Sequence, residues 1–208
     1  ALQRRVDHDD VVVPGAAGLG HRGRLVAAAH ARAQVLAQHG QGGRAVVVGL
    51  SLGGYVVMHL AERRPERVRG LVLAGATAEP DGLRAAPYRA LGWWMDALQG
   101  HGLDALNRWF FRTRFAPAIA EPIVSGGFWG YGGAEALRCL AGHRFKPSLA
   151  AYPGPVLILN GSLDVRFRRG QAGFKSAARD VRSVRIAGAT HLSNLDRPDA
   201  FSRAVRRF

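Results

Sequence analysis

The stretch VVVGLSLGGYVVMHL, residues 46–60, decides the fold because it sets one serine between an apolar β-branched run and a segment with helical spacing. Residues 46–48 suit a parallel strand buried on both faces, and residues 55–63 suit a helix. A strand that passes directly into a helix needs one strained residue with small neighbours, which Gly49, Ser51 and Gly53 supply. The sequence therefore predicts that Ser51 stands exposed above the sheet at a helix N-terminus, where developing negative charge is stabilised.

The composition is that of one globular domain with a sizeable core: 208 residues, 48% hydrophobic and 21% charged. No apolar run approaches the roughly 20 residues that span a bilayer, so we expect no membrane partner and a cytoplasmic location. The single cysteine, Cys139, excludes an intrachain disulfide and predicts no metal cluster. The net charge of +14 comes from basic residues dispersed along the chain without interleaved aromatics, so we expect no specific nucleic-acid partner.

Strands and helices are predicted to alternate along the chain. Predicted strands cover residues 11–13, 46–48, 68–74, 155–160 and 181–187, and predicted helices cover residues 25–38, 55–63, 171–179 and 199–208. This alternation is typical of the α/β class, with a doubly wound, mostly parallel sheet.

Residues 79–152 interrupt the alternation because they contain no convincing strand, and they hold all four tryptophans of the chain. We interpret them as a helical cap insertion, which divides the chain into a first core part (1–78), the insertion (79–152) and a second core part (153–208). Five aromatic residues of the insertion either wall an apolar pocket above Ser51 or form the insertion's own core: Trp94, Trp109, Phe110, Phe111 and Trp129.

A serine hydroxyl is a poor nucleophile until a base takes its proton, and the base needs an acceptor that orients it. VLILNGSLD (156–164) places Asp164 just past one predicted strand, and VRIAGATHLSNLDRP (184–198) places His191 just past the next. The sequence therefore predicts Ser51 as nucleophile, His191 as base and Asp164 as the orienting carboxylate.

Several alternatives to these assignments exist. Glu79 or Asp81, after the strand at residues 68–74, could supply the carboxylate in place of Asp164. Asp196 is expected to cap the final helix or to pair with Arg197. The remaining histidines are interpreted as surface or cap residues: His8, His21, His30, His39, His59, His101 and His143.

These motifs resemble those of the α/β-hydrolase superfamily. The resemblance rests on GLSLGG (49–54), PERVRGLVLAGATA (65–78), LILNGSLD (157–164) and GATHLSNLDRPDAF (188–201), in the order Ser, Asp, His. The chain is most similar to the capped esterases, enol-lactone hydrolases and carbon–carbon bond hydrolases. The resemblance implies the same three catalytic residues, the backbone N–H of Leu52 as an oxyanion donor, and no metal or organic cofactor.

The chain departs from the family pattern before the strand–turn–helix segment around Ser51, which is called the nucleophile elbow. Members of the family begin with about three further strands and a His-Gly loop that supplies a second oxyanion donor. Here one predicted strand and one predicted helix precede the elbow, and the loop PGAAGLG (14–20) lies one strand–helix unit too late. The sequence thus predicts either an amino-terminally shortened or fragmentary core, whose edge strand at residues 11–13 favours oligomerisation, or a compact variant in which another loop, such as residues 15–20, supplies the second donor.

The expected function is a serine hydrolase that cleaves a carboxylic ester or related acyl bond of a small, largely apolar substrate. One alternative is a non-catalytic, hydrolase-like protein that binds a small ligand, or an inactive fragment. Another is a cofactor-free perhydrolase or carbon–carbon bond hydrolase with the same triad.

Overall fold

The computed structural model describes residues 43–98, 101–128 and 130–208. The strand and helix expected at residues 11–13 and 25–38, the loop at 14–20 and Trp129 lie outside the described residues. The elements are β1 (Ala45–Leu50), α2 (Leu52–Arg63), η3 (Pro65–Arg67), β2 (Val68–Ala74), η4 (Gly82–Ala85), α3 (Ala86–Ala97), α4 (His101–Arg114), α5 (Pro117–Ser125), α6 (Gly130–Leu140), α7 (Lys146–Ala151), β3 (Pro155–Gly161), α8 (Val165–Ala177), β4 (Asp180–Ile186), α9 (Ser193–Asp196) and α10 (Pro198–Arg206).

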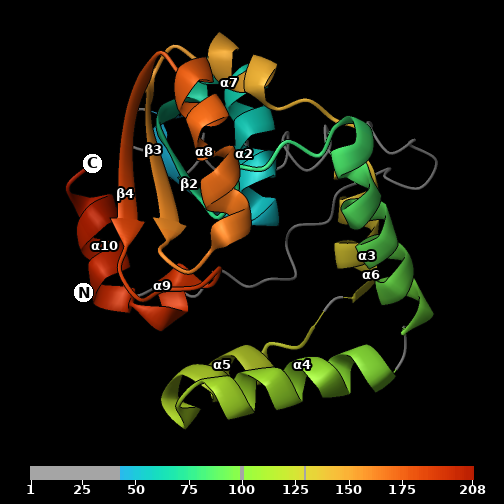
Figure 1. Ribbon diagram of the computed structural model, residues 1–208. Helices are drawn as coiled ribbons and strands as arrows, with labels where there is room; N and C mark the ends of the chain where they lie inside the picture. The colour runs from blue at the N-terminus through green and yellow to red at the C-terminus, as the bar shows by residue number, and fades with distance from the viewer. Residues whose placement is uncertain (1–42, 99–100, 129) are drawn as a thin grey trace.

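The described strands form one parallel sheet in the order β1-β2-β3-β4 (Figure 1). Val47 pairs with Leu71, Leu71 pairs with Val156, and Val156 pairs with Val181, so the register is continuous across the sheet. Helix α2 connects β1 to β2 and α8 connects β3 to β4, which are the crossovers that parallel neighbours require. The predicted α/β class with a parallel sheet is confirmed.

The two central strands bury both faces, and alternate residues separate the faces. Leu71 and Ile158 pack with residues of α2, α7 and α8 in one core cluster. Val72 and Leu159 pack with Ala200, Phe201 and Ala204 of α10 in another. Helices therefore cover both faces of the sheet, as the doubly wound prediction requires (Figure 1).

The outer strands of the described sheet are less buried than expected. Val47 of β1 packs on the core, but Val46 and Val48 on the opposite face are 37% and 45% exposed, so the prediction of burial on both faces is wrong for β1. On that face α10 lies in one apolar cluster with residues of β2, β3 and β4, and neither Val46 nor Val48 belongs to that cluster. The strand β4 lies at an edge of the described sheet, and most of its residues are exposed.

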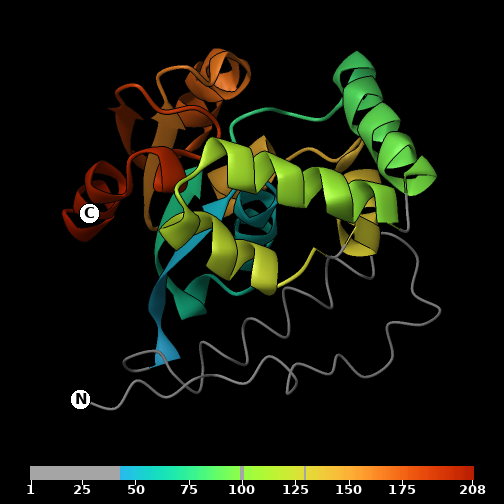
Figure 2. The same cartoon turned by 90° about the horizontal axis from the view of Figure 1, so that it is seen from below.

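Between β2 and β3 the structure describes helices and no strand, which confirms the predicted helical insertion; its limits at residues 79 and 152 stay a prediction. Helices α4 and α5 lie side by side beyond the carboxyl ends of the strands (Figures 1 and 2). Helices α3 and α6 form a second pair at the side of the core (Figure 1). None of the helices in the described part of the chain is both long and apolar enough to cross a bilayer.

Candidate active site

Ser51 occupies the turn between β1 and α2 in a strained conformation, with φ 50° and ψ −119°. It is the one non-glycine residue with positive φ in the described part of the chain. Its N–H donates a 2.7 Å hydrogen bond to the carbonyl of Ala74, which fixes the turn against β2. A Cβ at Gly49 would lie 2.5 Å from the carbonyl oxygen of Gly53, so the turn closes only with glycine at position 49. A Cβ at Gly53 would meet nothing within 4 Å, and the predicted need for a small residue is therefore wrong at that position.

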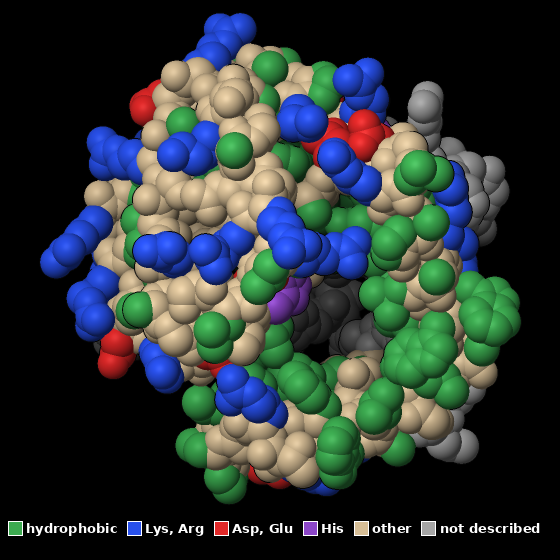
Figure 3. Space-filling model, viewed as in Figure 1, with side chains coloured by type: hydrophobic (Ala, Val, Ile, Leu, Met, Phe, Trp, Pro, Cys, Tyr) green, Lys and Arg blue, Asp and Glu red, His purple; other side chains and the backbone are tan. Residues whose placement is uncertain are grey.

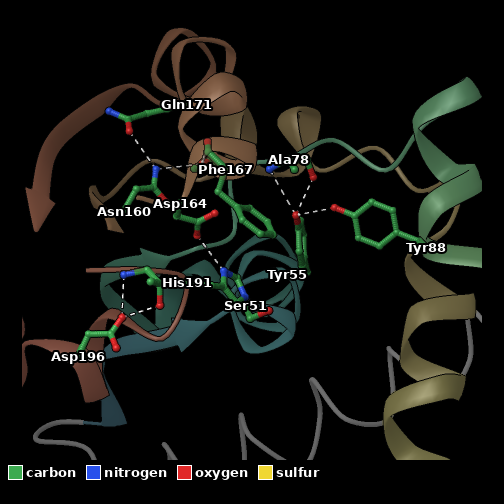
Figure 4. A network of polar contacts seen from close by, with 12 residues as sticks. Ser51, Tyr55, Ala78, Tyr88, Asn160, Asp164, Phe167, Gln171, His191 and Asp196 are labelled. Atoms are coloured by element: carbon green, nitrogen blue, oxygen red, sulfur yellow. Dashed lines mark hydrogen bonds and ion pairs between the residues drawn. The ribbon is translucent and has the colours of Figure 1, made fainter. Parts of the chain in front are cut away.

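The structure brings together the three side chains expected to act in concert (Figure 4). His191 Nε2 lies 2.8 Å from Ser51 Oγ, and His191 Nδ1 lies 2.8 Å from Asp164 Oδ2. The Asp164 side chain is 7% exposed and the His191 side chain 34%, so the carboxylate is buried behind an imidazole that remains open to solvent on one side. This is the arrangement in which an imidazole takes a hydroxyl proton while a carboxylate holds its other nitrogen.

Each of these residues follows the carboxyl end of a strand. Ser51 follows β1, Asp164 precedes α8 after β3, and His191 lies in the segment after β4. Asp164 occupies the N-cap position of α8, yet its carboxylate makes no capping hydrogen bond and is directed to His191 instead. Gly75, which follows β2 with φ 55°, lies so close to His191 that a Cβ there would stand 2.9 Å from the ring atoms Cε1 and Nδ1.

Phe167 is a neighbour of the imidazole that the sequence interpretation missed. Its ring stacks on His191 with a centroid distance of 4.7 Å and an interplanar angle of 21°. The signal was available, because residues three apart on a helix share a face and Asp164 immediately precedes α8. The backbone carbonyl of Phe167 accepts a hydrogen bond from Thr77 Oγ1, and Asn160 Nδ2 donates to the same Thr77 oxygen, so buried polar groups hold the first turn of α8 in place.

Asp196 does not do what the sequence suggested. Its Oδ2 accepts hydrogen bonds from the N–H and the hydroxyl of Thr190, at 2.7 and 2.5 Å (Figure 4). Its Oδ1 accepts one of 2.6 Å from Arg114. Arg197 donates to the backbone carbonyl of Asp196, and Arg197 itself is the N-cap of α10. The short helix α9 turns the Asp196 side chain back under Thr190, the residue before His191, and away from the start of α10.

The alternative carboxylates lie elsewhere. Glu79 Oε1 accepts hydrogen bonds from the N–H groups of Phe145 and Lys146, and Asp81 lies 4.0 Å from the guanidinium of Arg144. Of the three candidate acids, Asp164 is the one placed against His191.

A buried tyrosine stands one helical turn after Ser51. The hydroxyl of Tyr55 donates to the carbonyl of Ala78 at 2.6 Å and lies 3.4 Å from the hydroxyl of Tyr88 (Figure 4). Burial, followed by the neighbouring Tyr88 hydroxyl, raises the pKa of Tyr55 above its ordinary value. Tyr55 therefore stays protonated and anchors the segment after β2 to α2.

Two further expectations are modified. His59, interpreted as a surface or cap residue, is only 6% exposed, because the helical segment covers the face of α2 on which it lies.

Among the aromatic residues of the insertion, Phe111 stacks with Phe115 and Phe128, whereas Trp109 is 62% exposed. Phe111 thus belongs to the insertion's own packing.

The N–H of Leu52, the first residue of α2, is among those that a helix leaves without an intrahelical acceptor. It is adjacent to Ser51 and suits the predicted oxyanion contact. The loop at residues 14–20, which bears on the second oxyanion donor, lies outside the described residues.

Comparisons with known proteins identify the family to which the chain belongs. The profile of the family described as "Alpha/beta hydrolase family" matches residues 1–204. The chain is similar to 3-oxoadipate enol-lactonase 2 of Acinetobacter baylyi, with 28% identity over 176 residues that make up 82% of this chain. The match spans 65%, just under two thirds, of that enzyme.

Solved structures show the same fold. A hydrolase from Pseudomonas aeruginosa PA01 is 26% identical with a TM-score of 0.68, and the alignment covers 88% of this chain and 71% of that chain. A thermophilic esterase from Thermogutta terrifontis is 24% identical with a TM-score of 0.69 over the same shares of the two chains.

Proposed function

The chain belongs to the α/β-hydrolase family, and from this premise we propose that it is a serine hydrolase that cleaves a carboxylic ester or related acyl bond through an acyl-serine intermediate. The observation that carries the proposal is the continuous contact from Ser51 Oγ to His191 to Asp164, 2.8 Å at each step. The name of the related Acinetobacter enzyme, an enol-lactonase, supports an ester or lactone as the scissile group, since a lactone is an internal ester.

In the proposed first half-reaction, Ser51 Oγ attacks the carbonyl carbon while His191 Nε2 takes the hydroxyl proton. Asp164 accepts the Nδ1–H of His191, which selects the tautomer with a free Nε2 and stabilises the imidazolium that forms. The carbonyl oxygen becomes negatively charged and would accept a hydrogen bond from the N–H of Leu52, with the N-terminal end of α2 adding a favourable field.

The tetrahedral intermediate then collapses as the bond to the leaving oxygen breaks, and His191 returns its proton to that oxygen. The leaving group departs as an alcohol or, for a lactone, becomes a hydroxyl group that stays attached to the acyl chain of the opened ring. In the second half-reaction His191 removes a proton from water, whose oxygen attacks the acyl carbon. The bond between that carbon and Ser51 Oγ then breaks, His191 returns the proton to Oγ, and the carboxylic acid product leaves. His191, 34% exposed at its side chain, has the solvent access that this step needs.

The decisive experiment is covalent labelling with a fluorophosphonate, which reacts with an activated serine. Intact-mass analysis of the wild-type chain should show one adduct, and the Ser51→Ala variant should show none. Ser162→Ala is the matched control, because Ser162 Oγ accepts a hydrogen bond from the N–H of Gly188 and is not hydrogen-bonded to a histidine among the described residues. An unlabelled wild-type chain would favour the alternative of a ligand-binding protein without catalysis.

A further inference from the structure

The hydrogen bonds of His191 leave one movement of its ring weakly restrained. Its Nδ1 lies 2.8 Å from Asp164 Oδ2, and its Nε2 lies 2.8 Å from Ser51 Oγ. Hydrogen bonds to an imidazole run along the plane of the ring, because the N–H bond and the nitrogen lone pair both lie in that plane. The two contacts therefore fix where the nitrogens lie, but they oppose only weakly a tilt of the ring about the line that joins them. A contact on the face of the ring is needed to prevent this tilt.

Phe167 supplies a contact on that face. Its ring lies nearly parallel to the imidazole of His191, with centroids 4.7 Å apart and an angle of 21° between the planes (Figure 4). Phe167 is itself buried and belongs to the core cluster that includes residues of α2 and α7. Because that core is closely packed, the imidazole cannot tilt toward Phe167 without displacing core side chains.

The first turn of α8, which carries Phe167, is fixed by buried polar groups. Thr77 Oγ1 donates a 2.6 Å hydrogen bond to the backbone carbonyl of Phe167. Asn160 Nδ2 donates to Thr77 Oγ1 at 3.1 Å and to Gln171 Oε1 at 2.9 Å, so one amide joins β3, the segment after β2 and α8. A Cβ at Gly170 would collide with the carbonyl oxygen of Thr77, so α8 lies close against that segment. The position of the Phe167 ring is therefore well determined.

A restraint on ring tilt matters most after Ser51 has been acylated. In the proposed mechanism the Ser51 hydroxyl first donates to His191 Nε2, but the ester oxygen of an acyl-serine has no proton to donate. Asp164 and the face of Phe167 then hold the ring while Nε2 receives water. The His191 side chain is partly exposed, and Figure 3 shows a histidine at the edge of a hollow in the surface, bordered by hydrophobic side chains.

We propose that Phe167 is a positioning residue for His191, whose ring keeps the imidazole aligned with Asp164 during hydrolysis of the acyl-enzyme. Its contribution falls mainly on this second half-reaction, because the contact between His191 and the Ser51 hydroxyl aligns the ring in the first. The inference rests on the proposed function, since it concerns a step that requires an acyl-serine.

The test compares two substitutions in α8. Phe167→Leu removes the flat face and keeps an apolar side chain in the core. Phe174→Leu is the matched control, because Phe174 lies two turns further along the same helix, is buried in the same cluster and makes no ring contact with a histidine within the described residues. Urea denaturation should give the two variants similar losses of stability. A difference in catalysis between them then reports the contact with His191.

The kinetic measurement uses p-nitrophenyl acetate, whose good leaving group makes hydrolysis of the acetyl-enzyme the slow step. In Phe167→Leu we expect kcat to fall about tenfold, because the base is misplaced, and kcat/KM, which reports acylation, to fall much less, so that KM falls as well. Intact-mass analysis of acid-quenched turnover should show more acetyl-enzyme than in the wild-type protein. Phe174→Leu should keep the wild-type values. Equal effects of the two substitutions, or equal falls in kcat and kcat/KM, overturn the inference while the hydrolase function stands.

A spectroscopic measurement needs no turnover and separates the two possible failures. The ring current of an aromatic side chain shifts the NMR signals of protons over its face upfield. The Cε1–H signal of His191, assigned by its loss in His191→Ala, should therefore move downfield in Phe167→Leu and stay in place in Phe174→Leu. An unmoved signal means that the ring contact is absent, and overturns the inference. If the signal moves but the wild-type chain hydrolyses no ester, the proposed function fails, and the role of Phe167 in that reaction fails with it.

Discussion

Arg114, the last residue of α4, donates a 2.6 Å hydrogen bond to Asp196, whose other carboxylate oxygen holds the N–H of Thr190. His191 is the next residue. Within the part of the chain that the structure describes, no other side-chain hydrogen bond or ion pair joins α4 or α5 to the rest of the molecule. The position of these two helices is thereby coupled to the segment that carries the imidazole.

We expect Arg114→Ala to lower kcat/KM for a p-nitrophenyl ester about two- to fivefold, because the Arg114 side chain is 46% exposed and a partly exposed ion pair contributes less than about 1 kcal/mol. The loss should shrink in 1 M NaCl, which screens the pair in the wild-type protein. Arg112→Ala is the matched control, because Arg112 pairs with Glu121 inside the α4–α5 unit and should leave kcat/KM unchanged. Equal losses in the two variants would contradict the coupling.

Ser51→Ala and His191→Ala should each reduce ester hydrolysis by roughly four orders of magnitude or more, because nucleophile and base act as a unit. Far-UV circular dichroism should show the same helix content as the wild-type chain. Full activity of Ser51→Ala would assign hydrolysis to another group.

Asp164→Asn should lower kcat strongly without unfolding the protein, because an amide cannot stabilise the imidazolium of His191. Glu79→Gln should instead lower the stability of the protein and leave kcat nearly unchanged. Its buried carboxylate accepts hydrogen bonds from two backbone N–H groups, so loss of the charge should reduce the free energy of unfolding by about 1 kcal/mol. Urea denaturation and ester kinetics on both variants distinguish stability from catalysis, and the reverse pattern would move the catalytic carboxylate to Glu79.

Gly75→Ala should impair catalysis while every reacting group remains present. The added methyl group would stand 2.9 Å from the His191 ring and displace it from Ser51. Gly82→Ala is the control, because Gly82 has a similar φ of 51° against 55° but a Cβ there would meet nothing within 4 Å. Both substitutions introduce similar backbone strain, of about 1 kcal/mol. The two variants should therefore show a similar decrease in melting temperature. A drop in kcat confined to Gly75→Ala is the expected result.

His59 should make stability depend on pH. Burial lowers the pKa of this imidazole below its ordinary value, against an opposing effect of Glu62, while Arg63 and His143 add to the lowering. The unfolded chain then binds a proton more readily than the folded one, so the free energy of unfolding decreases as the pH falls below about 6.5.

The measurement is the melting temperature at pH 7.5 and at pH 5.5. His59→Phe, which cannot titrate, should show a smaller decrease between the two than the wild-type protein. An equal decrease in both proteins would mean that other groups account for it.

The sequence predicted that Ser51, Asp164 and His191 lie close together, because parallel topology alone sends the carboxyl ends of neighbouring strands to one edge of the sheet, and the two 2.8 Å contacts agree with that proximity; their catalytic roles stay a prediction. Strand ends can be recognised from short apolar runs followed by glycine and polar residues. The same local logic found the helical insertion, because a strand pattern was missing there.

Contacts between the insertion and the core could not be predicted in this way. The Arg114–Asp196 bond joins residues 82 positions apart, and nothing local to either one indicates how α4 lies over the sheet. The prediction that His59 is a surface or cap residue failed for the same reason, because elements that come much later in the chain cover α2 on the side away from the sheet.

The strained backbone of Ser51 has a bearing on how this sequence can change over time. A β-carbon at φ 50° costs roughly 1–2 kcal/mol that glycine would not incur, so Ser51→Gly relieves the strain and removes the nucleophile in one step. Selection for a stable fold alone would drive this position toward glycine. Under the proposed function, the need for the hydroxyl outweighs this cost and keeps serine, together with its strain, at position 51.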